Sequence, residues 1–163
     1  MQLLLCTIGK WKKAPETAIY NHYIRRSRWS LELRELTGYP TLDATERQRK
    51  ETELLLATAK EWNADKVIML DETGRALTSR EFANSLGDWQ ESRCRRVACL
   101  IGGDVGFEKT QLVRADLLIS FGTMTWPHLL VRVLFAEQLY RAQTILSGHP
   151  YHRDRAGRAW AGD

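Results

Sequence analysis

The regular alternation of short apolar runs with longer amphipathic stretches constrains the fold more than any other feature of this chain. Apolar runs of strand length separated by stretches of helix length are typical of crossover units in a mostly parallel sheet. The run at residues 97–101 is wholly apolar, as expected for a central strand that is buried on both faces. The pattern predicts an α/β fold with strands at residues 3–8, 31–36, 66–70, 97–101 and 117–121.

Capping residues indicate where the helices begin and end. Pro15 suits a first helical turn, because its missing N–H would have no intrahelical partner there. Asp43 is a favoured N-cap residue, and Thr78 with Glu81 forms a capping box. Gly148 suits a C-terminal stop. These signals predict helices at residues 15–28, 43–62, 107–115 and 128–146, and another that opens at the capping box.

Length and cysteine content narrow the class of protein. A chain of 163 residues fits one domain. The cysteines, Cys6, Cys94 and Cys99, are odd in number and form no Cys-x-x-Cys pair, which favours a reducing cytoplasm over a disulfide framework or a zinc site. No apolar run approaches the ~18 residues of a membrane helix, and the opening run is too short for an export signal. We therefore expect one cytoplasmic domain over residues 1–163, without a metal or a membrane span.

Basic residues are gathered in clusters, although the formal net charge is only +4. Such clusters attract phosphates, and a neighbouring tryptophan can stack on an unpaired base. Interleaved basic residues are also common on solvated surfaces, so the charge is compatible with RNA binding without showing it. The clusters are Lys10, Lys12 and Lys13 around Trp11; Arg25, Arg26 and Arg28 before Trp29; Arg93, Arg95 and Arg96; and Arg153, Arg155 and Arg158.

The loops that follow the third, fourth and fifth predicted strands are the candidate ligand site. Ligands of open α/β sheets bind beyond the carboxyl ends of the strands, and these loops span residues 71–74, 102–106 and 122–127. Glycines in the second loop allow the backbone to approach a ligand closely, although many such glycines serve only a turn. The Gly-x-Gly-x-x-Gly spacing is missing, which disfavours a dinucleotide site, and the first strand is followed by no phosphate-binding pattern.

Four motifs in a fixed order carry a resemblance to a known family. They read LIGGxxG at residues 100–106, WPHxxVRVL at 126–134, AEQLYRA at 136–142 and HPYHR at 149–153. Their order and spacing resemble the ribosomal large subunit methyltransferase H family, over nearly the whole chain and most densely after Lys66.

The resemblance implies a fold, a reaction and partners. The family belongs to the SPOUT class, whose parallel α/β sheet has its C-terminal segment threaded into a trefoil knot that forms the cofactor pocket. Its members are homodimers that use S-adenosylmethionine to methylate N3 of a pseudouridine in 23S rRNA, acting on the large subunit of the assembled ribosome. The departures described below leave two alternatives open: a different RNA target, or an idle relative that only binds rRNA.

Site residues follow from the resemblance, position by position. The implied cofactor site comprises Leu70, Gly102, Gly103, Phe121, Gly122, Thr123, Met124, Thr125 and Trp126. The implied groups near the target base, for positioning or proton handling, are Tyr151, His152 and Arg153. An RNA-binding or dimer role is implied for Arg132, Glu137, Arg141 and His149.

Methyl transfer makes few chemical demands on such a site. The sulfonium methyl is already electrophilic, so the enzyme must chiefly align it with N3, exclude water and ease removal of the N3 proton. Neither a nucleophile nor a metal is required. Histidine is suited to the proton because its charge changes near neutral pH, although His149 and His152 could equally be exposed tail residues.

The last predicted helix has an apolar arc that we interpret as core. Glu137 and Arg141 are spaced for an ordinary surface ion pair, and this remains the alternative to an interface role. The arc comprises Val131, Leu134, Phe135, Leu139, Ala142, Ile145 and Leu146.

Three features depart from the family pattern. The usual Gly-Gly-Pro-Glu-Gly loop reads Gly-Gly-Asp-Val-Gly at residues 102–106, so a rigid proline is lost. Trp126 stands where leucine is usual, which places a bulky indole at the expected rim of the pocket. The chain also continues past the last motif, through residues 154–163.

Overall fold

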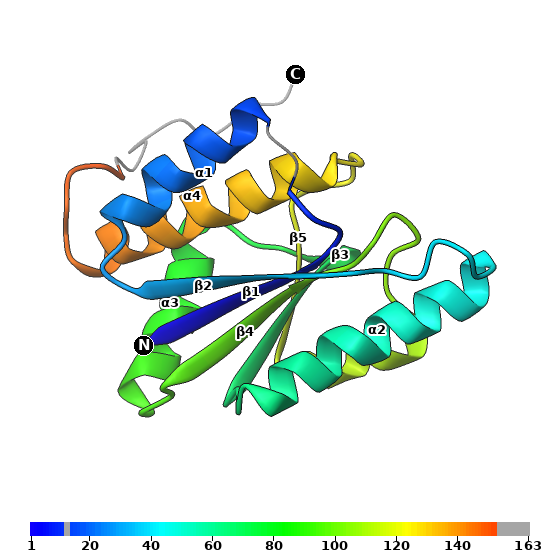
Figure 1. The fold of residues 1–163 in the computed structure, drawn as a ribbon. Helices are drawn as coiled ribbons and strands as arrows, with labels where there is room; N and C mark the ends of the chain where they lie inside the picture. The colour runs from blue at the N-terminus through cyan, green and yellow to red at the C-terminus, as the bar shows by residue number, and fades with distance from the viewer. Residues whose placement is uncertain (12–13, 153–163) are drawn as a thin grey trace, which may run out of the picture.

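The computed structural model describes residues 1–11 and 14–152, which form a five-stranded sheet with helices on both faces (Figure 1). The strand order is β2-β1-β4-β3-β5, and every pairing is parallel. All five predicted strands are confirmed. They are β1 (Gln2–Ile8), β2 (Ser30–Leu36), β3 (Lys66–Ala76), β4 (Arg96–Ile101) and β5 (Leu117–Ser120).

Strand β3 is longer than predicted because it pairs with β5 twice. Its first part pairs through Leu70 with Ile119, and after a break in register Arg75 again lies opposite Ile119. The polar residues between these points read as a loop in the sequence, and only the pairing with β5 makes them part of the strand.

The predicted helices are also confirmed. They are α1 (Pro15–Arg26), α2 (Ala44–Glu61), α3 (Ser79–Glu91) and α4 (His128–Leu146). The short segment after β4 is a 3₁₀ helix, η1 (Lys109–Arg114).

The capping signals form as predicted. The Asp43 carboxylate accepts the N–H groups of Thr45 and Glu46 at 3.0 Å. The Thr78–Glu81 capping box is present at the start of α3. Helix α4 ends in a Schellman turn with Gly148 in the left-handed region, at φ +66°.

Two apolar cores lie on opposite faces of the sheet (Figure 1). Helices α1, α3 and α4 cover one face, and α2 covers the other. Alternate β1 side chains supply the two cores: Leu3 and Leu5 face the first, whereas Leu4 and Cys6 face the second. A strand buried on both faces must be apolar throughout, which explains the continuous apolar runs in the sequence.

The predicted core arc of α4 is partly wrong. Leu146 is 42% exposed, whereas the polar residues Arg132 and Gln143 are buried. Because α4 packs against both α1 and α3, it is covered on more than one side. The Gln143 amide is satisfied there: its oxygen accepts the Arg28 N–H at 2.7 Å, and its nitrogen donates to the Ser27 hydroxyl at 2.6 Å.

The knot implied by the resemblance stays a prediction. The tail at residues 154–163 and the proposed catalytic Arg153 lie outside the described residues.

Candidate functional site

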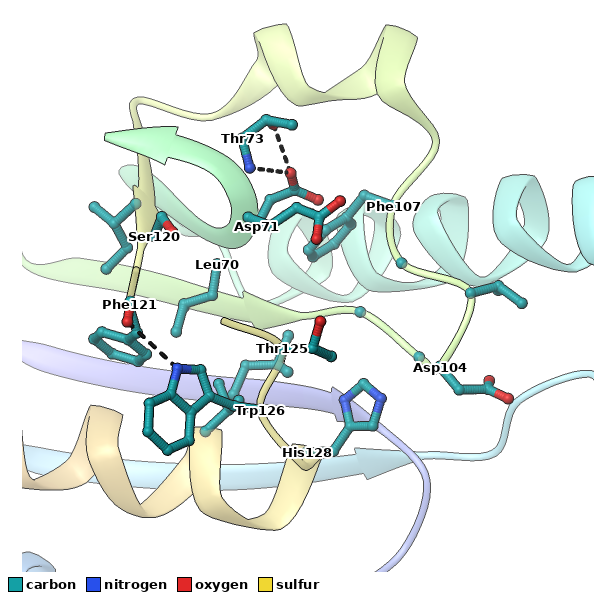
Figure 2. A pocket seen from close by; sticks show the side chains of 18 of the residues that line it. Leu70, Asp71, Thr73, Asp104, Phe107, Ser120, Phe121, Thr125, Trp126 and His128 are labelled. Carbon is teal, nitrogen blue, oxygen red and sulfur yellow. Dashed lines mark hydrogen bonds between the residues drawn. The ribbon is translucent and has the colours of Figure 1, made fainter. Parts of the chain in front are cut away.

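A pocket of about 310 Å³ lies at the carboxyl ends of β3, β4 and β5 (Figure 2). Its wall is made by the loops after these strands, together with His128 and Val131 from the start of α4. This is where an open α/β sheet binds its ligands. All residues predicted for the cofactor site line the pocket except Thr123.

Two glycines of the loop after β4, Gly102 and Gly103, have no room for a side chain. A Cβ on Gly102 would lie 3.2 Å from the carbonyl carbon of Gly106, and a Cβ on Gly103 would overlap the Glu51 carboxylate. Gly106 closes the turn by donating its N–H to the Gly103 carbonyl at 3.0 Å, and its φ of +71° favours glycine. The loop therefore presents bare backbone to the pocket.

An ion-pair chain from α2 holds this loop. Arg47 forms an ion pair with Asp104 in the loop and another, at 3.0 Å, with the buried Glu51. The hydrogen bond to Glu51, and its charge together with that of Asp104, raise the pKa of Arg47. Residue 104 is the position where the family has proline. In this chain an ion pair tethers the loop there.

Two further contacts from α2 fix the rest of the loop. The Gln48 amide donates to the Val105 carbonyl at 2.7 Å, and the Thr52 hydroxyl accepts the Glu108 N–H at 2.9 Å. Gln48 itself lines the pocket. Helix α2 thus supports the glycine loop, a contribution that the sequence motifs did not predict.

The loop after β5 is turned back on itself by local hydrogen bonds. The Ser120 hydroxyl accepts the Gly122 N–H at 3.1 Å and donates to the Gly122 carbonyl at 2.9 Å. Gly122 has a φ of +108°, a conformation that side chains rarely adopt. The Trp126 indole N–H donates to the Phe121 carbonyl at 3.4 Å (Figure 2). The indole therefore closes the loop and lies at the pocket wall, as the sequence predicted.

Acidic and polar side chains in β3, directly after Leu70, complete the wall. The Asp71 carboxylate accepts the Thr73 N–H at 2.9 Å and the Thr73 hydroxyl at 2.6 Å, which holds the turn (Figure 2). Glu72 lines the pocket beside them. The motifs did not identify these residues. Residues 71–74 nevertheless belong to the ligand site predicted from the sequence, because they directly follow the strand predicted at residues 66–70.

His128 lines the pocket, although it is not among the site residues predicted from the sequence. Burial lowers the pKa of its imidazole, with the charge of Asp104 acting in the opposite direction. The imidazole is therefore mostly neutral near pH 7 and able to accept a proton. The sequence did carry a signal for His128, because it directly follows Trp126 and Pro127 in the motif at residues 126–134 and begins α4.

The predicted catalytic residues Tyr151 and His152 lie at the other end of α4. The Tyr151 hydroxyl donates to Glu137 at 3.0 Å, and its ring centroid is 4.8 Å from that of Tyr140. From His128 to Tyr140 a helix rises about 18 Å. The structure therefore brings these tail residues together, away from the pocket of the same chain.

Charged groups surround the Tyr151 ring. Arg141 forms an ion pair with Glu137, and its guanidinium carbon is 4.9 Å from the Tyr151 centroid. Burial is the largest cause of the raised pKa of Tyr151, so its hydroxyl stays protonated and acts as a donor. His149 is exposed, and its ring accepts the Tyr151 N–H at 3.2 Å. Within the described residues, Tyr151 and His152 thus form one cluster with Glu137, Arg141 and His149, and Arg132 lies apart from it.

Arg132 is only 2% exposed. Its guanidinium donates to Glu35 and to the Gly9 carbonyl, both at 2.8 Å, and lies 5.1 Å from the centroid of the Trp11 indole. These contacts tie α4 to the ends of β1 and β2. The guanidinium is therefore occupied inside the chain.

Comparison with known proteins identifies the family. A family model described as a predicted SPOUT methyltransferase matches residues 1–152. The chain belongs to the SPOUT methyltransferases. Their fold class, predicted from the sequence, is confirmed for the parallel sheet and its flanking helices.

Curated relatives place the chain within the large subunit methyltransferase H group. The protein named ribosomal RNA large subunit methyltransferase H from Paramagnetospirillum magneticum is 49% identical, covering 94% of this chain and 99% of its own. The protein of the same name from Rhodospirillum centenum is 42% identical with the same coverage. The predicted family membership is confirmed.

A solved structure shares the fold at much lower identity. It is a probable methylase family protein from Haemophilus influenzae, with a TM-score of 0.55 and 8% identity, covering 94% of this chain and 70% of that one.

The described residues contain neither a metal-binding cluster nor a membrane-spanning helix. Within residues 1–11 and 14–152, no group of three or more His, Cys, Asp and Glu is arranged to hold a metal ion. No helix in that part of the chain has the length and apolarity to cross a membrane.

Proposed function

We propose that this SPOUT methyltransferase transfers a methyl group from S-adenosylmethionine to N3 of a pseudouridine in 23S rRNA. It acts as a homodimer on the large ribosomal subunit, in the cytoplasm. The observation that carries the proposal is the convergence of three strand-end loops on one pocket, in a chain 49% identical to a protein named as a large-subunit rRNA methyltransferase.

The pocket residues fit S-adenosylmethionine. A volume of about 310 Å³ lies at the lower end of the range for small-molecule sites. The bare backbone at Gly102 and Gly103 can hydrogen-bond a ligand at close range. The carboxylates of Asp71, Glu72 and Asp104 line the wall and favour a cationic ligand. When bound, the cofactor supplies an electrophilic methyl group on a sulfonium.

Removal of the N3 proton requires an acceptor near the pocket. His128 lies in the wall with a lowered pKa, which keeps its imidazole available as a base. Tyr151 has a raised pKa and serves instead as a hydrogen-bond donor that holds the base. In this proposal His128 accepts the N3 proton, and Tyr151 positions the base.

The tail residues would reach a pocket across the dimer. The Tyr151 hydroxyl binds Glu137, which lies about 9 Å along α4 from Val131 in the pocket wall, and neither Tyr151 nor His152 lines the pocket of its own chain. We therefore assign them to the pocket of the partner subunit. One active site would then combine the cofactor loops of one chain with the tail of the other.

Cofactor binding provides the first test. Calorimetry is expected to show one S-adenosylmethionine bound per chain, and Gly103→Ala should weaken binding at least about tenfold, because its Cβ overlaps the Glu51 carboxylate. Gly87→Ala in α3 is the matched control and should leave affinity unchanged. No binding by the wild-type dimer would refute the proposal. Unchanged affinity in Gly103→Ala would remove the glycine loop from the site.

The target is tested in cells. Deletion of the gene should abolish N3-methylpseudouridine in 23S rRNA, as measured by mass spectrometry. Restoration by the wild-type gene, but not by the Gly103→Ala form, would support the assigned reaction. Retention of the modified base in the deletion strain would contradict it, and loss of a different methyl group would favour another RNA target.

A mixing experiment tests the shared site. Gly103→Ala and Tyr151→Ala/His152→Ala chains should each be inactive, and co-refolding equal amounts should restore about a quarter of wild-type activity, because half the dimers then hold one intact site. If the tail serves its own chain, no mixed dimer holds an intact site. Absence of recovery would therefore contradict the shared arrangement.

A further inference from the structure

A second hollow lies at the opposite edge of the sheet, where β1 and β4 begin. It has a volume of about 600 Å³, and no Asp or Glu is among the residues that line it. Strand β4 separates it from the cofactor pocket by about 20 Å. The lining includes Met1, Gln2, Gln90, Arg93, Arg95 and Arg96.

The three arginines of this hollow differ in their contacts. Arg96 donates to the Trp62 carbonyl at 2.9 Å, so its guanidinium is held in place. Arg93 and Arg95 are exposed, and neither guanidinium has an ion pair or hydrogen bond within the part of the chain that the structure describes. Asp65 accepts the backbone N–H groups of Arg95 and Arg96 at 2.8 and 2.9 Å, which fixes the backbone beneath them.

The backbone at Arg93 is unusual for an arginine. Its φ is +65°, in the left-handed region, where it closes a Schellman turn at the end of α3 by donating its N–H to Gln90 at 3.1 Å. Helix α4 ends in the same kind of turn with Gly148 at the equivalent position. Glycine is favoured there because a Cβ is strained. An arginine at this position makes the folded chain less stable than a glycine would. We therefore expect the Arg93 side chain to contact a partner outside the chain.

We propose that Arg93, Arg95 and Arg96 form a phosphate-binding site for the sugar-phosphate backbone of the substrate RNA. Guanidinium groups bind phosphate oxygens in a bidentate manner, and such contacts set the position of a nucleic acid without reading its sequence. The site would hold RNA about 20 Å from the reacting base. The choice of RNA as partner rests on the proposed function.

Arg93→Gly tests the proposal with two opposed readouts. Glycine relieves the strained φ, so the midpoint of thermal unfolding should rise, while affinity for a labelled RNA hairpin should fall about threefold to tenfold. A purely structural role would not move these quantities in opposite directions. Lower stability with unchanged RNA affinity would overturn the proposal.

A salt series gives the second readout. The Arg93→Gly/Arg95→Gln form should reduce the slope of log affinity against log salt by about 1.5 to 2. Arg49→Gln/Lys60→Gln removes the same charge from the exposed surface of α2 and should leave the slope nearly unchanged. Equal effects of the two pairs, or no RNA binding by the wild type, would refute the site. Cofactor affinity, measured by calorimetry, should be unchanged in both, which separates this result from a failure of the proposed reaction.

Discussion

Gly74→Ala is expected to lower the free energy of unfolding by about 3 kcal/mol or more and to abolish cofactor binding. Gly74 lies in β3 next to Arg75, which pairs with Ile119 of β5, and a Cβ added to Gly74 would be 2.5 Å from the carbonyl carbon of Ile119 and 2.7 Å from its nitrogen. Both are backbone atoms, so the two strands would have to separate. The pocket loops that follow Leu70 and Ser120 would lose their register with them.

Urea denaturation and calorimetry measure these effects. Gly87→Ala is the matched control, because its added Cβ meets only the side chain of the exposed Leu146, at 3.0 Å. Alanine also has the higher helix propensity, so this variant should be at least as stable as the wild type. If Gly74→Ala unfolds at the same urea concentration as the control, the prediction is wrong, and the close approach of β3 to β5 does not require a glycine at residue 74.

Arg132→Met is expected to lower the free energy of unfolding by about 2–3 kcal/mol. Methionine fills the space but leaves the Gly9 carbonyl and the partly buried Glu35 carboxylate without their guanidinium partner. The segment after β1 would lose its attachment to α4. Chemical denaturation of the variant measures the loss.

A second ion pair on the same helix supplies the comparison. Arg141 pairs with Glu137, but its side chain is 26% exposed, so Arg141→Met should cost less than about 1 kcal/mol. Equal losses of unfolding free energy in Arg132→Met and Arg141→Met would show that burial of the arginine does not determine how much its ion pair stabilises the fold. A loss of activity with little loss of stability in Arg141→Met would instead support the RNA-binding or dimer role predicted for Arg141.

Local signals predicted most of the fold because they act over a few residues. The Asp43 cap, the Thr78 capping box and the Gly148 stop each involve hydrogen bonds within one turn, and all three form. Apolar runs marked the strands because a strand buried on both faces must be apolar. The extension of β3 escaped prediction, since its polar residues join the sheet only through β5.

The pocket was predictable for a different reason. Parallel strands end at one edge of the sheet, so the loops after them meet wherever the strands are neighbours. For this reason the order of the strands predicts that the segments at Leu70, Gly102 and Phe121 meet, and all three line the pocket. His128 lies in one of the motifs, but its place in the pocket wall was not predicted. The α2 residues behind the glycine loop lie in no motif, because their contribution depends on how distant elements pack.

The sequence by itself determined the fold class, the order of elements, the family and the loops of the candidate pocket, since these depend on periodicity, capping and motif spacing. Only the tertiary structure decided that Arg132 is buried, that Arg47 tethers Asp104, and that Tyr151 binds Glu137 of α4 and does not line the pocket of its own chain. Each of these facts joins residues from separate elements. Contacts of that kind depend on the packing of α1, α2 and α4 around the sheet, which no local pattern records.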